Sequence, residues 1–291
     1  MSIFTGSATA MITPFRDGNV DFEAFGKLLD FQLTSGTDAL VICGTTGEAS
    51  TMSFDEKCEV IRFAVEHVGG KVPVIAGTGA NNTKDAVKMS QAAEKAGANA
   101  LLVVTPYYNK TTQAGLTAHY NAIADAVTLP IILYNVPGRT GLNILPKTVK
   151  ELCKHKNIVA IKEASGNISQ IAEIAGLCPD CDIYSGNDDQ VLPIMSLGGK
   201  GVISTVSNII PREMHELCAS FSSGNYERAL KLQLRMLPMC KAAFCEVNPI
   251  PIKTMLSLYG MCEGELRLPL IPPQEENLHY IENAMKEYGL I

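Results

Sequence analysis

Eight short apolar runs recur along the chain up to about residue 224, and stretches with helical spacing lie between them. Most runs are nearly continuous in Val, Ile, Leu and Ala, which is typical of strands buried on both faces of a parallel sheet. The runs cover residues 7–13, 38–43, 72–76, 98–105, 130–134, 158–162, 182–184 and 201–205. The pattern therefore predicts a parallel sheet covered by helices.

The stretches between the runs also carry signals that start or end helices. Residues 22–33 repeat an apolar side chain every three or four positions, as an amphipathic helix does. Ser53 and Glu56 form a capping-box signature at the start of a second predicted helix. Gly97 is well placed to end the helix that begins near Thr83.

Eight strand–helix units match a (β/α)8 barrel, or TIM barrel, whose usual size is about 250 residues. An open doubly wound sheet is the alternative, and it requires a phosphate-binding glycine fingerprint in its first unit. The nearest string, Gly77-Thr-Gly79, lies in the third unit and lacks the third glycine. We therefore expect an α/β protein with a TIM barrel over residues 1–224.

The strand signal stops after residue 224. Residues 225–245, 248–260 and 274–289 have helical patterns that prolines interrupt. The sequence therefore predicts a C-terminal helical extension over residues 225–291.

Composition narrows the classes of protein. Of 291 residues, 46% are hydrophobic and 19% are charged, which indicates a folded chain with a sizeable core. The net charge is −6, so there is no basic surplus to bind nucleic acid. No apolar run approaches the length of a membrane span, and no targeting segment is visible. We expect a soluble, cytoplasmic protein.

The nine cysteines are irregularly spaced and odd in number, which favours a reduced protein with core thiols. Cys178 and Cys181 form the only CxxC pair, which is half of a zinc site, so redox and metal roles stay as alternatives. The five histidines are scattered and form no HxH or HExxH pattern. We expect neither a metal nor a cofactor.

In a TIM barrel the active site lies where the strands end. The polar segments that follow the predicted strands are Gly44-Thr-Thr-Gly-Glu48, Thr105-Pro-Tyr-Tyr-Asn109, Tyr134-Asn-Val-Pro-Gly-Arg-Thr140, Lys162-Glu-Ala-Ser-Gly166 and Ser185-Gly-Asn-Asp188. The barrel brings these ends together, so hydroxyl groups, one lysine and one arginine are expected to share one mouth.

Lys162 is the most informative of these residues because it ends an apolar strand. Burial there disfavours the ammonium form, and a neutral amine can attack a carbonyl to form a Schiff base. The alternative is a structural ion pair with Glu163. Adjacent strand residues point to opposite faces, which makes Glu163 a poor partner.

The other candidates support carbonyl and carboxylate chemistry. Tyr134 ends the neighbouring strand, where its phenol could pass protons if Thr45 and Tyr108 supply a hydroxyl chain. Thr45 and Thr46, between glycines, suit a small anion, and Arg139 suits a carboxylate. Taken singly, a tyrosine is better explained by aromatic packing, and the Thr45–Thr46 segment is equally well explained as an ordinary loop. A surface arginine is the alternative for Arg139.

Five motifs in register resemble the dihydrodipicolinate synthase family of pyruvate-dependent class I aldolases, and the likeness runs from residue 4 to residue 269. The motifs are Gly44-Thr-Thr-Gly-Glu48, Val104-Thr-Pro-Tyr-Tyr-Asn109, Tyr134-Asn-Val-Pro-Gly-Arg-Thr140, Ile161-Lys-Glu-Ala-Ser-Gly166 and Ser185-Gly-Asn-Asp188. The resemblance implies that pyruvate and L-aspartate 4-semialdehyde condense through a lysine Schiff base and enamine. The product, 4-hydroxy-tetrahydrodipicolinate, belongs to the diaminopimelate route to lysine.

The resemblance also implies roles for individual residues. Lys162 would form the imine, and Tyr134, Thr45 and Tyr108 would form a proton relay in which Tyr108 completes the site of a neighbouring subunit. The implied assembly is a homotetramer built as a dimer of dimers.

Four further residues would bind the substrates according to the same resemblance. Thr46 would hold the pyruvate carboxylate near Gly186 and Ile203, and Arg139 would bind the carboxylate of the semialdehyde. The alternatives are another Schiff-base 2-keto acid aldolase, such as N-acetylneuraminate lyase, and a keto-acid-binding barrel without turnover. Arg139 in its Pro-Gly-Arg-Thr loop favours the synthase.

One departure from the family pattern concerns feedback by lysine. Inhibited bacterial members carry His at the positions of Phe54 and Lys57 and Glu at that of Asp85, at a subunit interface. Phe54 accepts no polar contact, and Lys57 adds positive charge beside a cationic ligand. We therefore expect weak inhibition by lysine, or none.

Overall fold

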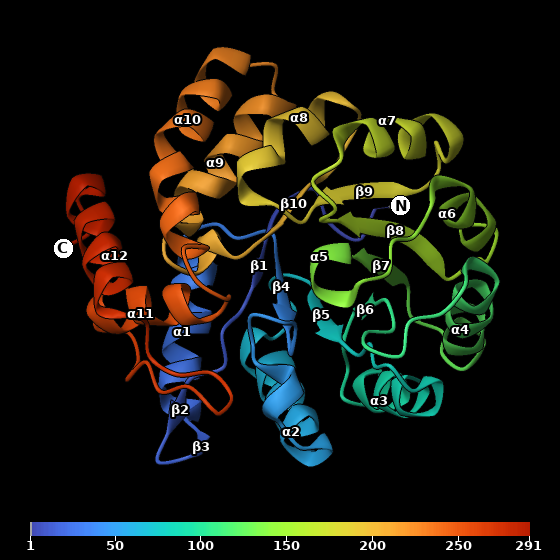
Figure 1. Cartoon of the computed structure of the whole chain (residues 1–291), viewed down its shortest axis with the longest axis horizontal. Helices are drawn as coiled ribbons and strands as arrows, with labels where there is room; N and C mark the ends of the chain where they lie inside the picture. The colour runs from blue at the N-terminus through green and yellow to red at the C-terminus, as the bar shows by residue number, and fades with distance from the viewer. Residues whose placement is uncertain (1) are drawn as a thin grey trace.

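Eight parallel strands form a closed barrel in the computed structural model, which describes residues 2–291 (Figure 1). The strands are β1 (Gly6–Ala10), β4 (Ala39–Ile42), β5 (Val74–Gly77), β6 (Ala100–Val104), β7 (Ile131–Asn135), β8 (Ile158–Glu163), β9 (Asp182–Ser185) and β10 (Gly201–Ser204). Each strand pairs with the next, and β10 closes onto β1. They coincide with the eight apolar runs, so the predicted barrel is confirmed.

Helices alternate with the strands and cover the outside of the barrel. They are α1 (Phe22–Thr34), α2 (Phe54–Val68), α3 (Thr83–Lys95), α4 (Gln113–Asp125), α6 (Pro146–Leu152), α7 (Ile168–Leu177), α8 (Val191–Ser196) and α9 (Pro211–Ser222). The short helix α5 (Pro137–Thr140) instead follows the end of β7 and lies inside this ring of helices (Figure 1). The capping box of Ser53 and Glu56 starts α2, and Gly97 follows α3 with a φ of +89°. Both predicted helix signals are therefore present.

The sheet separates two apolar clusters, one inside the barrel and one between the barrel and its helices. Along β7, Ile132 and Tyr134 belong to the inner cluster, whereas Ile131 and Leu133 pack outward. This alternation follows from the two-residue repeat of a strand. It also decides which residue at each strand end faces the mouth of the barrel.

Three further helices follow the barrel: α10 (Tyr226–Ala243), α11 (Ile250–Leu258) and α12 (Glu275–Tyr288). They match the predicted C-terminal helices and stand on one side of the barrel in Figure 1. α10 packs on α9, and α12 packs on α10 and α11. The division at residue 224 stays a prediction, because this packing is continuous across it.

Short elements escaped the sequence pattern. β2 (Phe15–Arg16) and β3 (Asn19–Val20) form a two-stranded antiparallel sheet outside the barrel, and 3₁₀ turns occur at η1 (Ala49–Thr51), η2 (Asp188–Gln190) and η3 (Val206–Asn208). Segments of two or three residues are too short to show a period. Within residues 2–291, none of the helices combines the length and apolar character that crossing a membrane requires.

Candidate active site

Lys162 lies on β8 with only 5% of its surface exposed. Ala160, two residues earlier, belongs to the inner cluster, so the lysine side chain also points into the barrel. Its register partner is Tyr134 on β7, and its Nζ atom lies 4.5 Å from the centroid of the Tyr134 ring. The sequence-predicted amine and phenol are therefore neighbours at the mouth of the barrel.

Glu163 points away from this lysine. Its carboxylate accepts hydrogen bonds of 3.1 Å from the Asn135 and Gln170 side-chain amides and of 2.8 Å from the backbone N–H of Ser165. These contacts use the carboxylate fully on the helix side of the sheet. The structural ion pair between Lys162 and Glu163 is therefore ruled out, as the strand alternation predicts.

Thr46 is held in place from two distant parts of the chain. Its Oγ1 accepts a 2.9 Å hydrogen bond from Asn248 Nδ2 and lies 3.4 Å from Thr205 Oγ1. Asn248 precedes α11, and Thr205 follows β10. Sequence analysis missed both partners, because the spacing of apolar residues does not show that the C-terminal region reaches the barrel mouth.

Gly186 contributes space rather than a hydrogen-bond donor. A Cβ atom at this position would lie 2.6 Å from the Ala164 Cβ and 3.1 Å from Lys162 Cε, and the Gly186 N–H already donates to the Glu163 carbonyl at 2.8 Å. Ile203 is fully buried in the inner cluster on β10. Gly186 therefore leaves space beside the lysine, whereas a role of Ile203 in binding stays a prediction.

Asp188 is a third residue whose part in the site was not predicted from the sequence. Its Oδ2 accepts hydrogen bonds of 3.2 Å from the backbone N–H groups of Thr205 and Val206. Its buried Oδ1 has no partner among residues 2–291. Burial raises the pKa of Asp188, and hydrogen bonds from Ser204, Val206 and Thr205 together with the charge of Lys162 oppose that rise. The acid therefore fixes the loop that carries Thr205.

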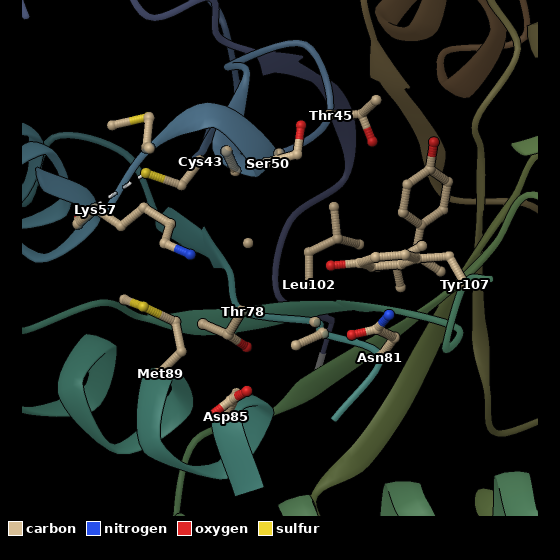
Figure 2. Close-up of a pocket in the computed structure, with 18 of the residues that line it drawn as sticks. Cys43, Thr45, Ser50, Lys57, Thr78, Asn81, Asp85, Met89, Leu102 and Tyr107 are labelled. Carbon is tan, nitrogen blue, oxygen red and sulfur yellow. Dashed lines mark hydrogen bonds between the residues drawn. The ribbon is translucent and has the colours of Figure 1, made fainter. Parts of the chain in front are cut away.

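A cavity of about 680 Å³ opens beside these residues (Figure 2). Thr45, Tyr134 and Arg139 line it, and Arg139 Nη2 donates a 3.2 Å hydrogen bond to the carbonyl of Asn248. Figure 2 shows Thr45 and Tyr107 at one end of the cavity and Lys57 at the other. The hydroxyl and guanidinium groups needed for anionic substrates therefore share one space with the phenol.

Tyr108 is the one predicted site residue that the chain does not bring to its own site. Its side chain is 90% exposed, and its φ of +70° lies in the left-handed region. Tyr107, the next residue back, lines the cavity instead. Within one chain, the predicted hydroxyl relay therefore contains Tyr134 and Thr45 without Tyr108.

A buried ion pair holds the turn that carries Thr45 and Thr46 in place. Lys253 on α11 binds Glu48, and both side chains are almost fully buried. Burial lowers the pKa of Lys253, and Glu48 opposes this shift. Removing one member of such a pair leaves an uncompensated buried charge, so the pair restrains the turn strongly.

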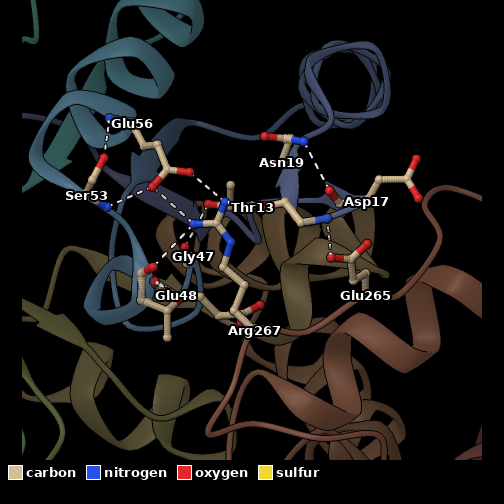
Figure 3. Close-up of polar contacts among 11 residues, drawn as sticks. Thr13, Asp17, Asn19, Gly47, Glu48, Ser53, Glu56, Glu265 and Arg267 are labelled. Carbon is tan, nitrogen blue, oxygen red and sulfur yellow. Dashed lines mark hydrogen bonds and ion pairs between the residues drawn. The ribbon is translucent and has the colours of Figure 1, made fainter.

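Arg267 extends this support (Figure 3). Its backbone N–H donates to Glu48 at 3.1 Å, and its guanidinium binds both oxygens of Glu56 at 2.6 and 3.1 Å. The hydrogen bonds from Arg267 lower the pKa of Glu56 from 4.5 to about 2. The segment after α11 is thereby tied to the start of α2.

The site combines a buried amine, an adjacent phenol, several hydroxyl groups and one guanidinium. Such a set can form an imine with a keto acid and bind carboxylates on either side of it. In the part of the chain that the structure describes, no group of three or more His, Cys, Asp or Glu residues is arranged to hold a metal ion.

Comparison with known proteins agrees with the motifs. The dihydrodipicolinate synthetase family matches residues 3–288. A 4-hydroxy-tetrahydrodipicolinate synthase 1 of Clostridium acetobutylicum is 58% identical over 292 residues, covering all of both chains. The crystal structure of dihydrodipicolinate synthase from Thermotoga maritima has a TM-score of 0.97 and 45% identity, also covering all of both chains.

A further solved structure bears on the ligand. It is a chloride-inhibited dihydrodipicolinate synthase of Acinetobacter baumannii in complex with pyruvate. Its TM-score is 0.96 at 42% identity, over 99% of each chain. Because the family match and these similarities extend over nearly the whole length, the chain belongs to the dihydrodipicolinate synthetase family.

Proposed function

We propose that the chain is a 4-hydroxy-tetrahydrodipicolinate synthase that condenses pyruvate with L-aspartate 4-semialdehyde. The observation that carries this proposal is the buried Lys162 amine beside the Tyr134 phenol at the barrel mouth. Full-length relatives at 52–58% identity bear the same name. The reaction belongs to the diaminopimelate route to lysine, which we expect to run in the cytoplasm.

The reaction begins at Lys162. Its neutral amine attacks the carbonyl carbon of pyruvate, and loss of water leaves an imine. The protonated imine withdraws electrons, so the methyl group loses a proton and an enamine forms. The enamine carbon then bonds to the aldehyde carbon of the semialdehyde. The amino group of the semialdehyde attacks the imine carbon and displaces Lys162, which closes the ring and frees the enzyme.

Tyr134 and Thr45 move the protons of these steps. The phenol lies next to the amine and can deliver the proton that converts the hydroxyl of the first adduct into water. Thr45 lines the same cavity and passes protons to and from the phenol. Holding both substrates in this space removes an entropic barrier of as much as about 7–11 kcal/mol.

The two substrate carboxylates bind on different sides of the lysine. Thr46, held by Asn248 and close to Thr205, donates to the pyruvate carboxylate. Gly186 leaves room beside Lys162 for this small acid. Arg139 lines the cavity together with Tyr134 and binds the carboxylate of the semialdehyde through its guanidinium.

Tyr108 completes the relay of a neighbouring subunit. It is almost fully exposed on the loop after β6 and therefore free to enter the site of a second copy. The functional unit is then a dimer at least, and we expect two such dimers to form a homotetramer.

The cavity end near α2 accounts for the expected resistance to lysine. Lys57 and Lys88 both line it, and the Lys88 ammonium lies 3.9 Å from the centroid of the Phe54 ring. Asp85 is the acidic residue that lines this end of the cavity. Free lysine, whose side chain is positively charged, gains little binding energy there because Lys57 and Lys88 repel it.

Steady-state assays with added lysine test this resistance. We expect activity to persist at sub-millimolar lysine, and the double variant Phe54→His/Lys57→His is expected to be more strongly inhibited than the natural protein. Complete inhibition of the natural protein in that range would refute the proposal.

Borohydride trapping tests the proposed chemistry directly. Pyruvate followed by borohydride should leave a covalent adduct on Lys162, which peptide mass spectrometry locates. Lys57→Arg, which changes a lysine of the cavity lined by Thr45 and Tyr134, should trap pyruvate as well as the natural protein does. An adduct on another lysine, or none, would rule the mechanism out.

Turnover distinguishes the synthase from its alternatives. A coupled assay with both substrates should show condensation, and N-acetylneuraminate offered in parallel should not be cleaved. Trapping without condensation would identify another keto acid aldolase or a binding protein.

A further inference from the structure

Three cysteines that the proposed reaction does not use gather near the start of β8 and β9. Cys153 caps the C-terminus of α6, Cys178 caps that of α7, and Cys181 directly precedes β9. Cys178 and Cys181 are the CxxC pair of the sequence, and the barrel adds Cys153 from the preceding strand–helix unit. This group of three residues is called the thiol cluster below.

Two sulfur atoms of the thiol cluster face each other. Cys153 Sγ lies 2.9 Å from Cys181 Sγ, and the remaining seven cysteines have no such partner in the described residues. A disulfide bond measures about 2.05 Å between sulfurs. Little movement therefore separates the two free thiols from a covalent bond.

Access to the thiol cluster is uneven. Cys153 is half-buried, whereas Cys178 and Cys181 are only 6% exposed. The hydrogen bond with Cys153 and burial both raise the pKa of Cys181. Burial, followed by the charge of Cys153, raises the pKa of Cys178 to about 11. An oxidant in solution therefore reacts first with Cys153. Cys181 is the thiol already in contact with Cys153.

We propose that Cys153 and Cys181 form a reversible disulfide when the protein meets a peroxide. The peroxide oxidises the Cys153 thiol to a sulfenic acid and is itself reduced to water or an alcohol. The Cys181 sulfur then attacks the Cys153 sulfur, the S–S bond forms and the sulfenic hydroxyl leaves as water with the Cys181 proton. A dithiol reductant reverses the change by exchange.

Metal binding is the alternative role for a cluster of three cysteines. Within residues 2–291, no set of three or more His, Cys, Asp or Glu residues has an arrangement that could hold a metal ion. The direct contact of Cys153 and Cys181 also leaves no room for an ion between their sulfurs. The geometry favours the bond between sulfurs.

The disulfide would stabilise the fold and preserve the reaction. It closes a loop that contains α7 and the whole of β8, including Lys162. Cross-links of this kind restrict the unfolded chain. Both cysteines precede their strands, at the face of the barrel opposite the active site. The thermal midpoint is therefore expected to rise on oxidation, while kcat stays unchanged.

Peptide mapping of the full-length protein tests the proposal without any substitution. After treatment with hydrogen peroxide, a non-reducing digest should contain one cross-linked peptide pair with Cys153 and Cys181, lighter by two hydrogen atoms. Denatured protein should then titrate seven thiols in place of nine, and dithiothreitol should restore nine. Nine thiols after treatment, or a bond between Cys178 and Cys181, would overturn the proposal.

Variants add a second readout. Cys153→Ser and Cys181→Ser should lose both the cross-link and the oxidation-dependent rise in thermal midpoint. Cys178→Ser and the remote Cys262→Ser should keep both. Equal rises in Cys153→Ser and the natural protein would assign the stabilisation to another modification and refute the cross-link. These outcomes are independent of the synthase proposal, because none of them requires turnover.

Discussion

At the residue scale, adjacent positions on β8 have opposite environments. Lys162 faces the barrel mouth beside an aromatic ring, and Glu163 is held on the helix side by Asn135 and Gln170. The two-residue repeat of a strand allowed this to be predicted from the sequence. It could not reveal Asn248 or Asp188, because their roles depend on contacts between segments far apart in the chain.

Replacing Tyr134 by Phe separates proton transfer from packing. The ring that lies over the Lys162 amine remains, while the hydroxyl is lost. We expect kcat to fall by roughly a hundredfold or more, as for other acid–base groups, with a thermal midpoint close to that of the natural protein. Steady-state kinetics and thermal melts check this, and Tyr280→Phe on exposed α12 is the matched control. Unchanged kcat would exclude the phenol from the relay.

Gly186→Ala tests the space beside the lysine. The added methyl group would lie 2.6 Å from the Ala164 Cβ, which must shift, and 3.1 Å from Lys162 Cε, which must also give way slightly. We expect borohydride trapping of pyruvate to slow at least tenfold. Gly176→Ala, on α7 with open space around its Cα, should trap at the natural rate and be as stable or slightly more so. Equal trapping in both variants would disprove the spatial role.

At the element scale, the barrel was predictable because most strands are nearly continuous apolar runs, and the runs require no long-range information. The support of the Thr45–Thr46 turn was not predictable. Lys253 and Glu48 are about two hundred residues apart, and each alone reads as an ordinary charged residue. The sequence therefore offered candidates for the chemistry, whose roles stay predictions, but not the residues that position them.

The link between α2 and the segment after α11 predicts a pH dependence. Arg267 lowers the pKa of Glu56 to about 2 in the folded protein, from 4.5. The link therefore contributes its full stabilisation above pH 4.5 and loses it as the pH falls towards 2. In Glu56→Gln the unfolding free energy should fall less across this window than in the natural protein.

Urea melts at several pH values between 4.5 and 2 measure this difference. Glu59→Gln, an exposed acid on the same helix, controls for the loss of one charge. Parallel curves for the natural protein and Glu56→Gln would show that Arg267 does not act through this acid.

At the scale of the whole molecule, the exposure of Tyr108 leads us to expect that two copies of the chain contribute to each site. Tyr108→Phe and Lys162→Arg should each be nearly inactive alone. In a mixed dimer, the Lys162→Arg subunit supplies its intact Tyr108 to the partner's intact Lys162. Unfolding and refolding the two variants together should therefore restore activity in one site of each mixed dimer. Activity no higher than the sum of the separate variants would show that Tyr108 does not cross between subunits.

The hydrogen bond from Asn248 to Thr46 has a consequence for how the protein is made. Synthesis proceeds from the N-terminus, so all eight barrel strands are made before Asn248 and Lys253 are added. The turn that we propose binds pyruvate can form these contacts only when Asn248 and α11 have been made. A nascent chain that has all eight strands therefore still lacks the contacts from Asn248 and Lys253 that position the proposed pyruvate-binding turn.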